Sequence, residues 1–238
     1  NKKTINQSRS KDHIGALQQS ITAMHIAIFG NTNNYPLLLA QGFRQLGVSV
    51  KLFINRKELL HRPESKIPNY AIAYPDWIYD CSNIAEDDFV CESSRIGDVI
   101  NALVSGSDGV ILNHLGPSLT HLIEKPSIAF LTGSDLTYYG DYETITVREA
   151  SWGEDYKRSP GALLIRRHWE RFVGRQRAGI AAAKRVSFPW PGLVAEGDRL
   201  LSEIGVLDQR RFFIFMADTL NLQYCPPPKN RVLRLFNG

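Results

Sequence analysis

Residues 25–50 read HIAIFGNTNNYPLLLAQGFRQLGVSV, a pattern of strand, turn, helix and second strand that decides the fold. The run His25–Phe29 is short, apolar and rich in β-formers, as is typical of a strand buried on both faces. Gly30 ends this strand, and apolar residues then recur at three- and four-residue spacing, which predicts a helix. Pro36 suits the first turn of that helix and Gly47 suits its end. The stretch therefore predicts the opening unit of a parallel α/β sheet.

The same alternation of short apolar runs and helical stripes continues along most of the chain. Strands are expected at residues 25–29, 48–54, 71–74, 109–112, 127–131, 185–188 and 212–216. The longest predicted helix covers residues 161–184, whereas residues 141–160 are predicted to form a loop. Six or seven strands separated by helices predict a doubly wound parallel sheet of the Rossmann-like α/β class, with right-handed crossovers.

Composition excludes several classes of protein. The net charge of +4 arises mainly in residues 1–23, a polar basic tail with four basic side chains and one acidic one, so the rest of the chain is nearly neutral. This distribution gives little support for nucleic-acid binding. The three cysteines, Cys81, Cys91 and Cys225, form no metal-ligand pattern. With no apolar run of about 18 residues and no signal-peptide pattern, a cytoplasmic protein without metal or cofactor is expected.

Ligands of open parallel sheets bind in the crevice outside the carboxyl ends of the strands, so the loops there are candidate site walls. The first such loop supplies Gly30, Asn31, Asn33 and Asn34. These residues could donate hydrogen bonds to hydroxyl or phosphate groups at a helix N-terminus. The alternative is a tight turn in which the asparagines cap the helix. The loop lacks the G-x-G-x-x-G pattern of a dinucleotide site.

Two later loops follow predicted strand ends in the same way. His114 follows the strand over residues 109–112, so its imidazole could face the crevice, although a single histidine is often structural. Ser134 and Asp135 follow the strand over residues 127–131. Ser134 could bind a sugar hydroxyl, and Asp135 could act as a base toward an acceptor hydroxyl. The alternative is that both residues cap the helix that starts near Leu136.

The segment from Lys157 to Arg185 holds nine basic residues and a single acid. Arg167, Arg171 and Arg175 are candidates for a surface that contacts anionic lipid heads or a lipid-linked acceptor. A solvated helix face is the alternative. Nucleic acid is not expected as a partner, because no aromatic stacking platform accompanies the arginines.

In the order of its segments, the chain resembles the N-terminal domain of a GT-B glycosyltransferase, closest to the retaining family-four type. The motifs that carry this resemblance are Gly30–Pro36, Asn113–Gly116, Thr132–Leu136, the segment 176–189 and the segment 213–226. Together they lie in the order that such a domain has, over roughly residues 24–238.

The resemblance implies an enzyme that moves a sugar from a nucleotide-sugar to an acceptor with retention of configuration. In that family the nucleotide-sugar is held mainly by a C-terminal domain, and a histidine on the loop of His114 touches the sugar or the reacting oxygens. Residues 24–225 would then form the acceptor-side domain, and residues 226–238 the linker and the start of a missing donor-binding domain. The isolated chain is accordingly expected to be inactive. Its acceptor would be a glycan, a lipid-linked compound or a small molecule. The enzyme would contact the inner face of the membrane peripherally.

A non-catalytic α/β binding or interaction domain of flavodoxin-like shape is the alternative function. The linker Pro226–Pro228 and the segment Arg231–Gly238 favour the transferase, because they read as the beginning of a second α/β domain. An independent nucleotide-dependent oxidoreductase is disfavoured by the missing glycine fingerprint.

Overall fold

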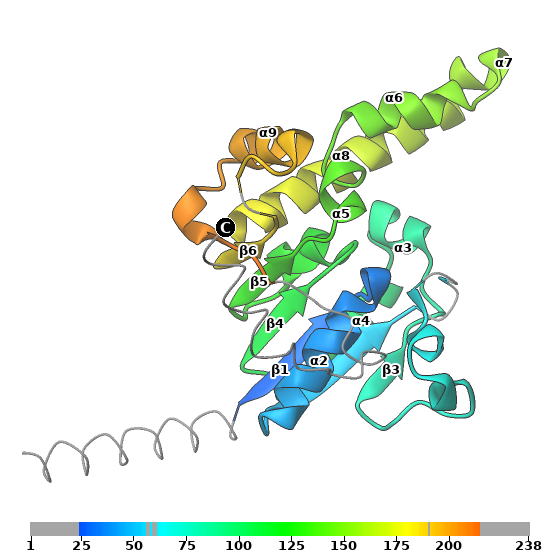
Figure 1. The fold of residues 1–238 in the computed structure, drawn as a ribbon. Helices are drawn as coiled ribbons and strands as arrows, with labels where there is room; N and C mark the ends of the chain where they lie inside the picture. The colour runs from blue at the N-terminus through cyan, green and yellow to red at the C-terminus, as the bar shows by residue number, and fades with distance from the viewer. Residues whose placement is uncertain (1–23, 56–57, 59–60, 190, 215–238) are drawn as a thin grey trace, which may run out of the picture.

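The computed structural model describes residues 24–55, 58, 61–189 and 191–214. It contains a seven-stranded sheet in which every neighbouring pair is parallel, in the order β3-β2-β1-β4-β5-β6-β7 (Figure 1). The doubly wound Rossmann-like α/β fold is therefore confirmed. The predicted basic tail of residues 1–23 and the linker over residues 226–238, with Cys225, lie outside the described residues.

The bounds of the strands agree with the sequence pattern at most positions. The strands are β1 (His25–Phe29), β2 (Ser49–Ile54), β3 (Ile78–Asp80), β4 (Gly109–Leu112), β5 (Ser127–Phe130), β6 (Arg185–Ser187) and β7 (Arg211–Phe212). The predicted strand at residues 71–74 is wrong. A 3-10 helix, Pro68–Ala71, occupies its start, and the edge strand forms a few residues later as β3, beside β2.

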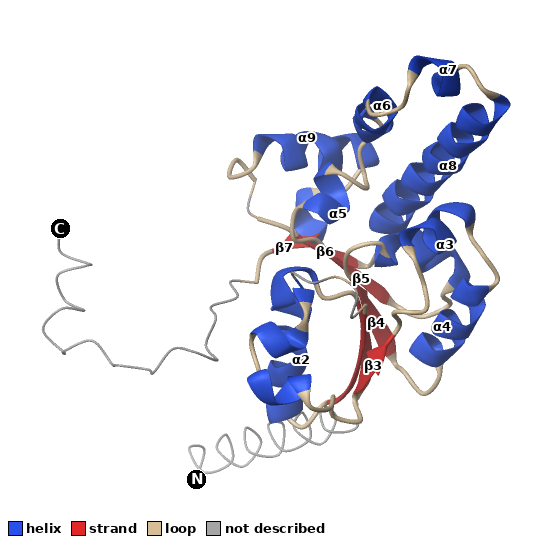
Figure 2. Ribbon diagram, turned by 90° about the vertical axis from the view of Figure 1, so that its right-hand side faces the viewer, coloured by secondary structure: helices blue, strands red, loops and turns tan. Residues whose placement is uncertain are grey.

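The helices cover both faces of this sheet. They are α2 (Tyr35–Gln45), α3 (Glu86–Cys91), α4 (Arg95–Val104), α5 (Ser134–Thr137), α6 (Glu143–Ala150), α7 (Glu154–Lys157), α8 (Pro160–Ala182) and α9 (Ala195–Ile204). Figure 2 shows α2 on one side of the sheet, and α3, α4 and α8 on the other. The predicted loop at residues 141–160 is also wrong, because α6 and α7 form there against α8.

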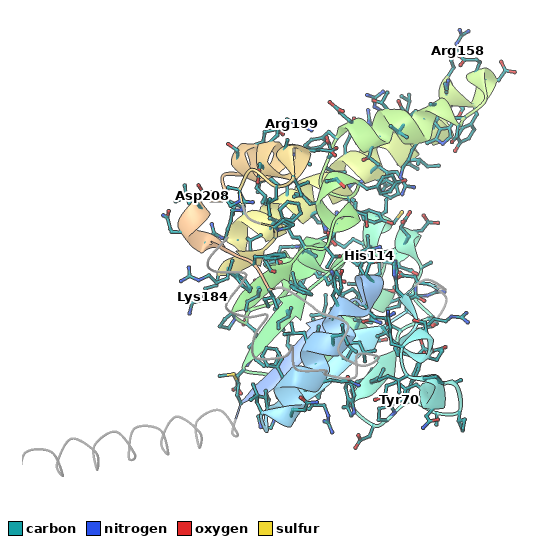
Figure 3. The ribbon with its side chains drawn as sticks, in the orientation of Figure 1. Tyr70, His114, Arg158, Lys184, Arg199 and Asp208 are labelled. Atoms are coloured by element: carbon teal, nitrogen blue, oxygen red, sulfur yellow. The ribbon has the colours of Figure 1, made fainter. Side chains whose placement is uncertain are left out.

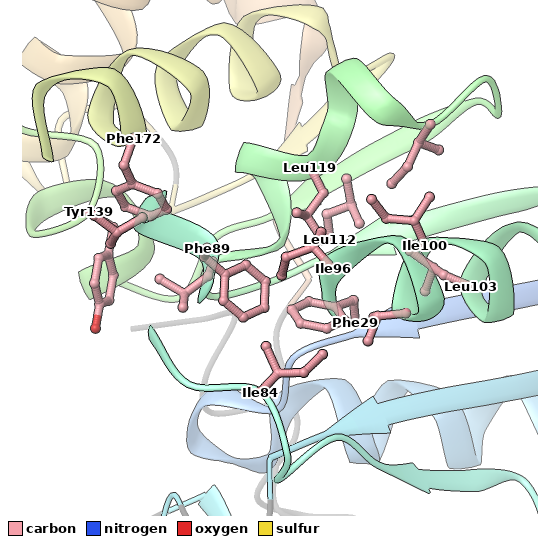
Figure 4. Close-up of a cluster of buried hydrophobic side chains, with 14 of the residues drawn as sticks. Phe29, Ile84, Phe89, Ile96, Ile100, Leu103, Leu112, Leu119, Tyr139 and Phe172 are labelled. Atoms are coloured by element: carbon pink, nitrogen blue, oxygen red, sulfur yellow. The ribbon is translucent and has the colours of Figure 1, made fainter. Parts of the chain in front are cut away.

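The two faces of β1 belong to two different hydrophobic clusters. Ala27 and Phe29 join the cluster under α3, α4 and α8, whereas Ile28 joins the cluster under α2. Successive side chains of a strand point to opposite faces, so an unbroken apolar run is what a sheet covered on both sides requires. Figure 4 shows Phe29 beside Phe89 and Ile96 in the first of these clusters.

The strand order reverses between β1 and β4, which lie side by side although β2 and β3 separate them in sequence. Their carboxyl ends are aligned, because Phe29 pairs with Leu112. A switch point of this kind leaves a crevice, since the connections from the two strands leave the edge in opposite directions. The loops after β1 and β4 therefore line the same crevice from two sides.

Helices α6 and α7 and the first half of α8 form an arm that extends beyond the sheet, with Arg158 at its tip (Figures 1 and 3). The second half of α8 is core, with Phe172, Val173 and Ile180 fully buried. On the arm, Leu163 and Leu164 are 54% and 55% exposed. Among the helices that the structure describes, none is both long enough and apolar enough to cross a membrane.

We predict that Gly179→Ala destabilises the fold by about 3 kcal/mol. Helix α8 contacts the 3-10 helix η5 (Gly116–Leu122) so closely here that a Cβ on Gly179 would lie 1.8 Å from the carbonyl oxygen of Pro117. The backbones of α8 and η5 would have to move apart to accommodate the added methyl group. Urea denaturation followed by circular dichroism measures the loss.

The matched control is Gly97→Ala in α4, where an added Cβ meets no atom within 4 Å. This exposed helical site should gain about 0.5–1 kcal/mol from the better helix propensity of alanine. Equal stability of the two variants would contradict the close contact between α8 and η5.

Candidate functional site

Asn113, the first residue after β4, joins the three loops at the switch point. Its Oδ1 accepts a hydrogen bond from Thr32 N at 2.9 Å, in the loop after β1. Its Nδ2 donates to Phe130 O at 2.8 Å and to Asp135 Oδ2 at 3.0 Å, in and after β5. The side chain is completely buried. One amide therefore holds the loops after β1, β4 and β5 in a fixed relation.

The backbone around Asn113 accepts only glycine at one neighbouring position. A Cβ on Gly30 would lie 2.6 Å from the carbonyl oxygen of Asn113, and Gly30 has a φ of +88°. Both facts require glycine, because L side chains rarely adopt this φ and no space exists for one. The absence of a side chain at the end of β1 lets the two loops approach.

His114 follows in a left-handed backbone conformation, with φ of 58°. Residues other than glycine rarely adopt it, and such positions are concentrated at functional sites. Its carbonyl oxygen accepts a hydrogen bond from Nε2 of the fully buried Gln176 on α8, at 2.8 Å. Figure 3 labels His114, which lies just beyond the carboxyl end of the central strand β4. Helix α8 thus holds the turn through the backbone carbonyl of His114, and the imidazole takes no part in this hydrogen bond.

The imidazole of His114 lines a cavity of about 380 Å³ at the carboxyl ends of β1, β2 and β4. Its polar lining includes Glu58, His61 and Glu86. Its aromatic lining consists of Phe29, Phe53, Phe89 and Tyr139. No lysine or arginine is among the described residues that line it. The cavity combines hydrogen-bond acceptors with apolar walls.

Glu58 and His114 face each other, with Oε1 and Nδ1 3.5 Å apart. Burial raises the pKa of Glu58 to about 7, and the negative charge of Glu86 adds to this shift. Burial also lowers the pKa of His114 to about 4, with a further contribution from His61. Loss of water penalises the charged form of either group. At neutral pH His114 is therefore an uncharged imidazole.

Glu86, the first residue of α3, is held by one side chain that lines the cavity and by one that does not. It accepts hydrogen bonds from the hydroxyl of Tyr139 at 2.5 Å and from Nη2 of Arg148 at 3.0 Å. The Arg148 guanidinium, on the arm helix α6, lies 3.6 Å from the ring centroid of Trp169. Tyr139 in turn packs edge-on against the His114 ring, and Figure 4 shows its hydroxyl pointing away from the hydrophobic cluster.

The loop after β1 forms hydrogen bonds with the first turn of α2 and with residues 61–65. Asn31 Oδ1 accepts from Leu37 N at 3.0 Å, and His61 Nδ1 accepts from Asn33 N at 3.0 Å. Asn34 is buried against Ser65. Of the predicted binding residues in this loop, Gly30 and Asn31 line the cavity, whereas Asn33 and Asn34 do not. The capping alternative therefore describes Asn31, whereas Asn34, at the N-cap position of α2, makes no side-chain capping hydrogen bond.

The predicted pair Ser134 and Asp135 lies outside the His114 cavity. Asp135 is completely buried, and its carboxylate accepts from the backbone N–H groups of Thr132 and Gly133, each at 2.9 Å. Burial raises its pKa to about 6, although these hydrogen bonds oppose the shift. Ser134 is exposed. Asp135 thus has the position of a structural carboxylate that holds Asn113, rather than that of a base open to an acceptor.

The three arginines predicted to form one surface have different surroundings. Nη2 of Arg175 donates to the carbonyls of Phe89 and Val90 at 2.7 and 3.3 Å, which places a cation at the C-terminus of α3. Arg167 and Arg171 are exposed and line a shallow hollow with Tyr142. Only Arg167 and Arg171 therefore remain open to a partner.

A second cavity, of about 500 Å³, lies at the carboxyl ends of β5 and β6. It is lined mainly by apolar residues, including Phe130, Phe188 and Ile214, with Thr132 and Gly133 at the loop after β5. The loop that carries the predicted Ser134 thus borders this cavity and not the one at His114.

Several residues of the site were not predicted. Glu86 belongs to the acidic run of residues 76–98, which has the composition of an ordinary solvated face. Glu58 follows β2, and Tyr139 lies beyond the short helix α5. The signal in the sequence that could have indicated the connection between the loops is Asn113, a polar residue directly after the apolar run 109–112. Nothing in the local pattern indicates which loops it joins.

Comparisons with protein families, with characterised proteins and with solved structures find no match for this chain. Within the described residues, no group of three or more His, Cys, Asp and Glu side chains is arranged to hold a metal ion. The chemistry of the site must therefore follow from its own geometry.

We predict that Asn113→Ala destabilises the fold by about 3 kcal/mol, because it leaves Thr32 N and Phe130 O buried without this partner. Chemical denaturation measures the change. Asn101→Ala on the exposed face of α4 is the control and should have an effect within about 0.5 kcal/mol. A small effect at residue 113 would contradict the joining of the three loops by its amide.

A second prediction concerns pH. Because the pKa of Glu58 is raised to about 7, the folded state binds its proton more tightly than the unfolded state. The contribution of Glu58 to stability therefore falls as pH rises from about 4.5 to about 7, by up to about 3 kcal/mol. Glu58→Gln removes this loss.

The free energy of unfolding of both proteins, measured across this window, should show the variant gaining on the parent up to about pH 7 and then levelling. His114 contributes a slope of the opposite sign, since its pKa is lowered, and this slope largely cancels in the difference. A flat difference curve would show that Glu58 is not buried as described.

Proposed function

We propose that this chain is the acceptor-side domain of a glycosyltransferase, which moves a sugar from a nucleotide-sugar to an acceptor hydroxyl with retention of configuration. A second domain would hold most of the nucleotide-sugar. The Rossmann-like sheet and the position of the cavity at the switch point support this proposal. So does the order of the loops at Gly30, Asn113 and Thr132, on which the resemblance to GT-B transferases rests.

The single observation that carries the proposal is the chemistry of the His114 cavity. Its polar groups include a carboxylate and an uncharged imidazole, both of which accept hydrogen bonds from hydroxyl groups. Its volume of about 380 Å³ lies within the range of roughly 300–1,000 Å³ that small-molecule sites have. Aromatic walls suit the apolar faces of a sugar ring.

The same cavity is poorly suited to a nucleoside diphosphate. Phosphate recognition in proteins relies on lysine, arginine, metal ions or open helix N-termini. Neither lysine nor arginine lines the cavity among the described residues, and in the first turn of α2 Leu37 N already donates to Asn31 Oδ1. This distribution of charge favours an acceptor site here and a donor site elsewhere.

The expected test result is that monosaccharides, but not nucleotide-sugars, bind this chain. Saturation-transfer NMR should detect glucose or galactose in the cavity, and His114→Asn should abolish the signal while tolerating the left-handed φ. His121→Asn on the exposed side of η5 is the control. Calorimetry with UDP-glucose and GDP-mannose should detect no micromolar binding.

Micromolar binding of either nucleotide-sugar to this chain alone would contradict the assignment of the donor to a second domain. Absence of a signal from every monosaccharide would contradict the acceptor role of the cavity.

A further inference from the structure

Among the residues that the structure describes, the lining of the His114 cavity carries acidic side chains and neither lysine nor arginine, a composition that the proposed transfer reaction does not by itself require. Two carboxylates line it, Glu58 and Glu86, and no lysine or arginine does so among the described residues. His114 adds no positive charge at neutral pH. A ligand bearing a phosphate or a carboxylate would place a further negative charge beside these groups, with little water to screen it.

The two carboxylates differ in how their charges are balanced. Glu86 pairs with Arg148, which approaches from the arm and does not line the cavity, and it accepts a hydrogen bond from the hydroxyl of Tyr139. Glu58 faces the uncharged His114 at 3.5 Å and is influenced by the negative charge of Glu86. Among the described residues that line the cavity, none places a lysine or arginine charge beside Glu58.

The walls favour a cation as well. Phe29, Phe53, Phe89 and Tyr139 line the same cavity as Glu58. Aromatic rings attract ammonium groups through their negative faces, most strongly where water is excluded. A carboxylate together with aromatic side chains is therefore the chemistry that recognises an organic ammonium group.

We infer that the acceptor taken by this cavity is an amino sugar or a similar hydroxylated amine, whose ammonium group pairs with Glu58 while its hydroxyl groups reach His114. This inference rests on the proposed function, since it names the class of acceptor for the same cavity. It predicts discrimination by charge among sugars of equal size.

A matched series tests it: glucose, 6-amino-6-deoxyglucose, 2-amino-2-deoxyglucose and glucose 6-phosphate, titrated into the chain at about pH 7.5, where Glu58 is largely ionised. At least one amino sugar should bind about tenfold more tightly than glucose, as one charge-assisted hydrogen bond predicts. Glucose 6-phosphate should bind more weakly than glucose. Calorimetry or NMR titration provides the affinities.

Glu58→Gln should bring the ratio of amino-sugar affinity to glucose affinity down to about one, because an amide accepts a hydrogen bond but carries no charge. Glu124→Gln, at an exposed carboxylate away from the cavity, should leave the whole series unchanged. The preference should also fall as pH drops below the pKa of Glu58, which faces His114, His61 and Glu86.

Glucose binding as tightly as both amino sugars, or glucose 6-phosphate binding more tightly, would overturn the inference and leave the acceptor role intact. A preference for the amine that persists in Glu58→Gln would overturn it too. If no sugar in the series binds, the proposed function falls and the inference falls with it.

Discussion

The structure of the site depends on the hydrogen bonds of one buried amide. Asn113 lies at the point where the strand order reverses, and its side chain connects the loops after β1, β4 and β5. Because Thr32, Phe130 and Asp135 are buried, loss of the hydrogen bonds to them would leave polar groups without water as a substitute. The position of His114, the next residue, follows from this constraint and from the hydrogen bond that Gln176 Nε2 donates to its carbonyl oxygen.

Burial then decides the electrostatic state of the cavity. A histidine and a glutamate in contact would form an ion pair in water, yet here their pKa values move so that both tend toward the neutral form. At the same cavity Glu86 accepts a hydrogen bond from Arg148, which reaches it from the arm. Within the described residues, the same cavity thus holds one carboxylate that is paired with an arginine and one that faces an uncharged imidazole.

Much of the fold could be predicted from local patterns, and much of the site could not. The unit from β1 to β2 follows from apolar periodicity, with Gly30 at the end of the strand and Gly47 at the end of the helix. Helix α6 was missed because its sequence pattern is weakly amphipathic, and packing of Arg148 on Trp169 stabilises it only in the folded chain. The role of His114 as a cavity residue was predicted by position, whereas Glu58 and Glu86 enter through long-range contacts that no local pattern records.

The connected loops around Asn113 carry a thermodynamic consequence. A wall that is ordered before any ligand arrives has already lost its conformational freedom during folding, so association need not order it again. Calorimetric heat capacities of binding should then reflect the dehydration of the ligand and the aromatic surface alone, without the larger signature that coupled folding of a segment produces.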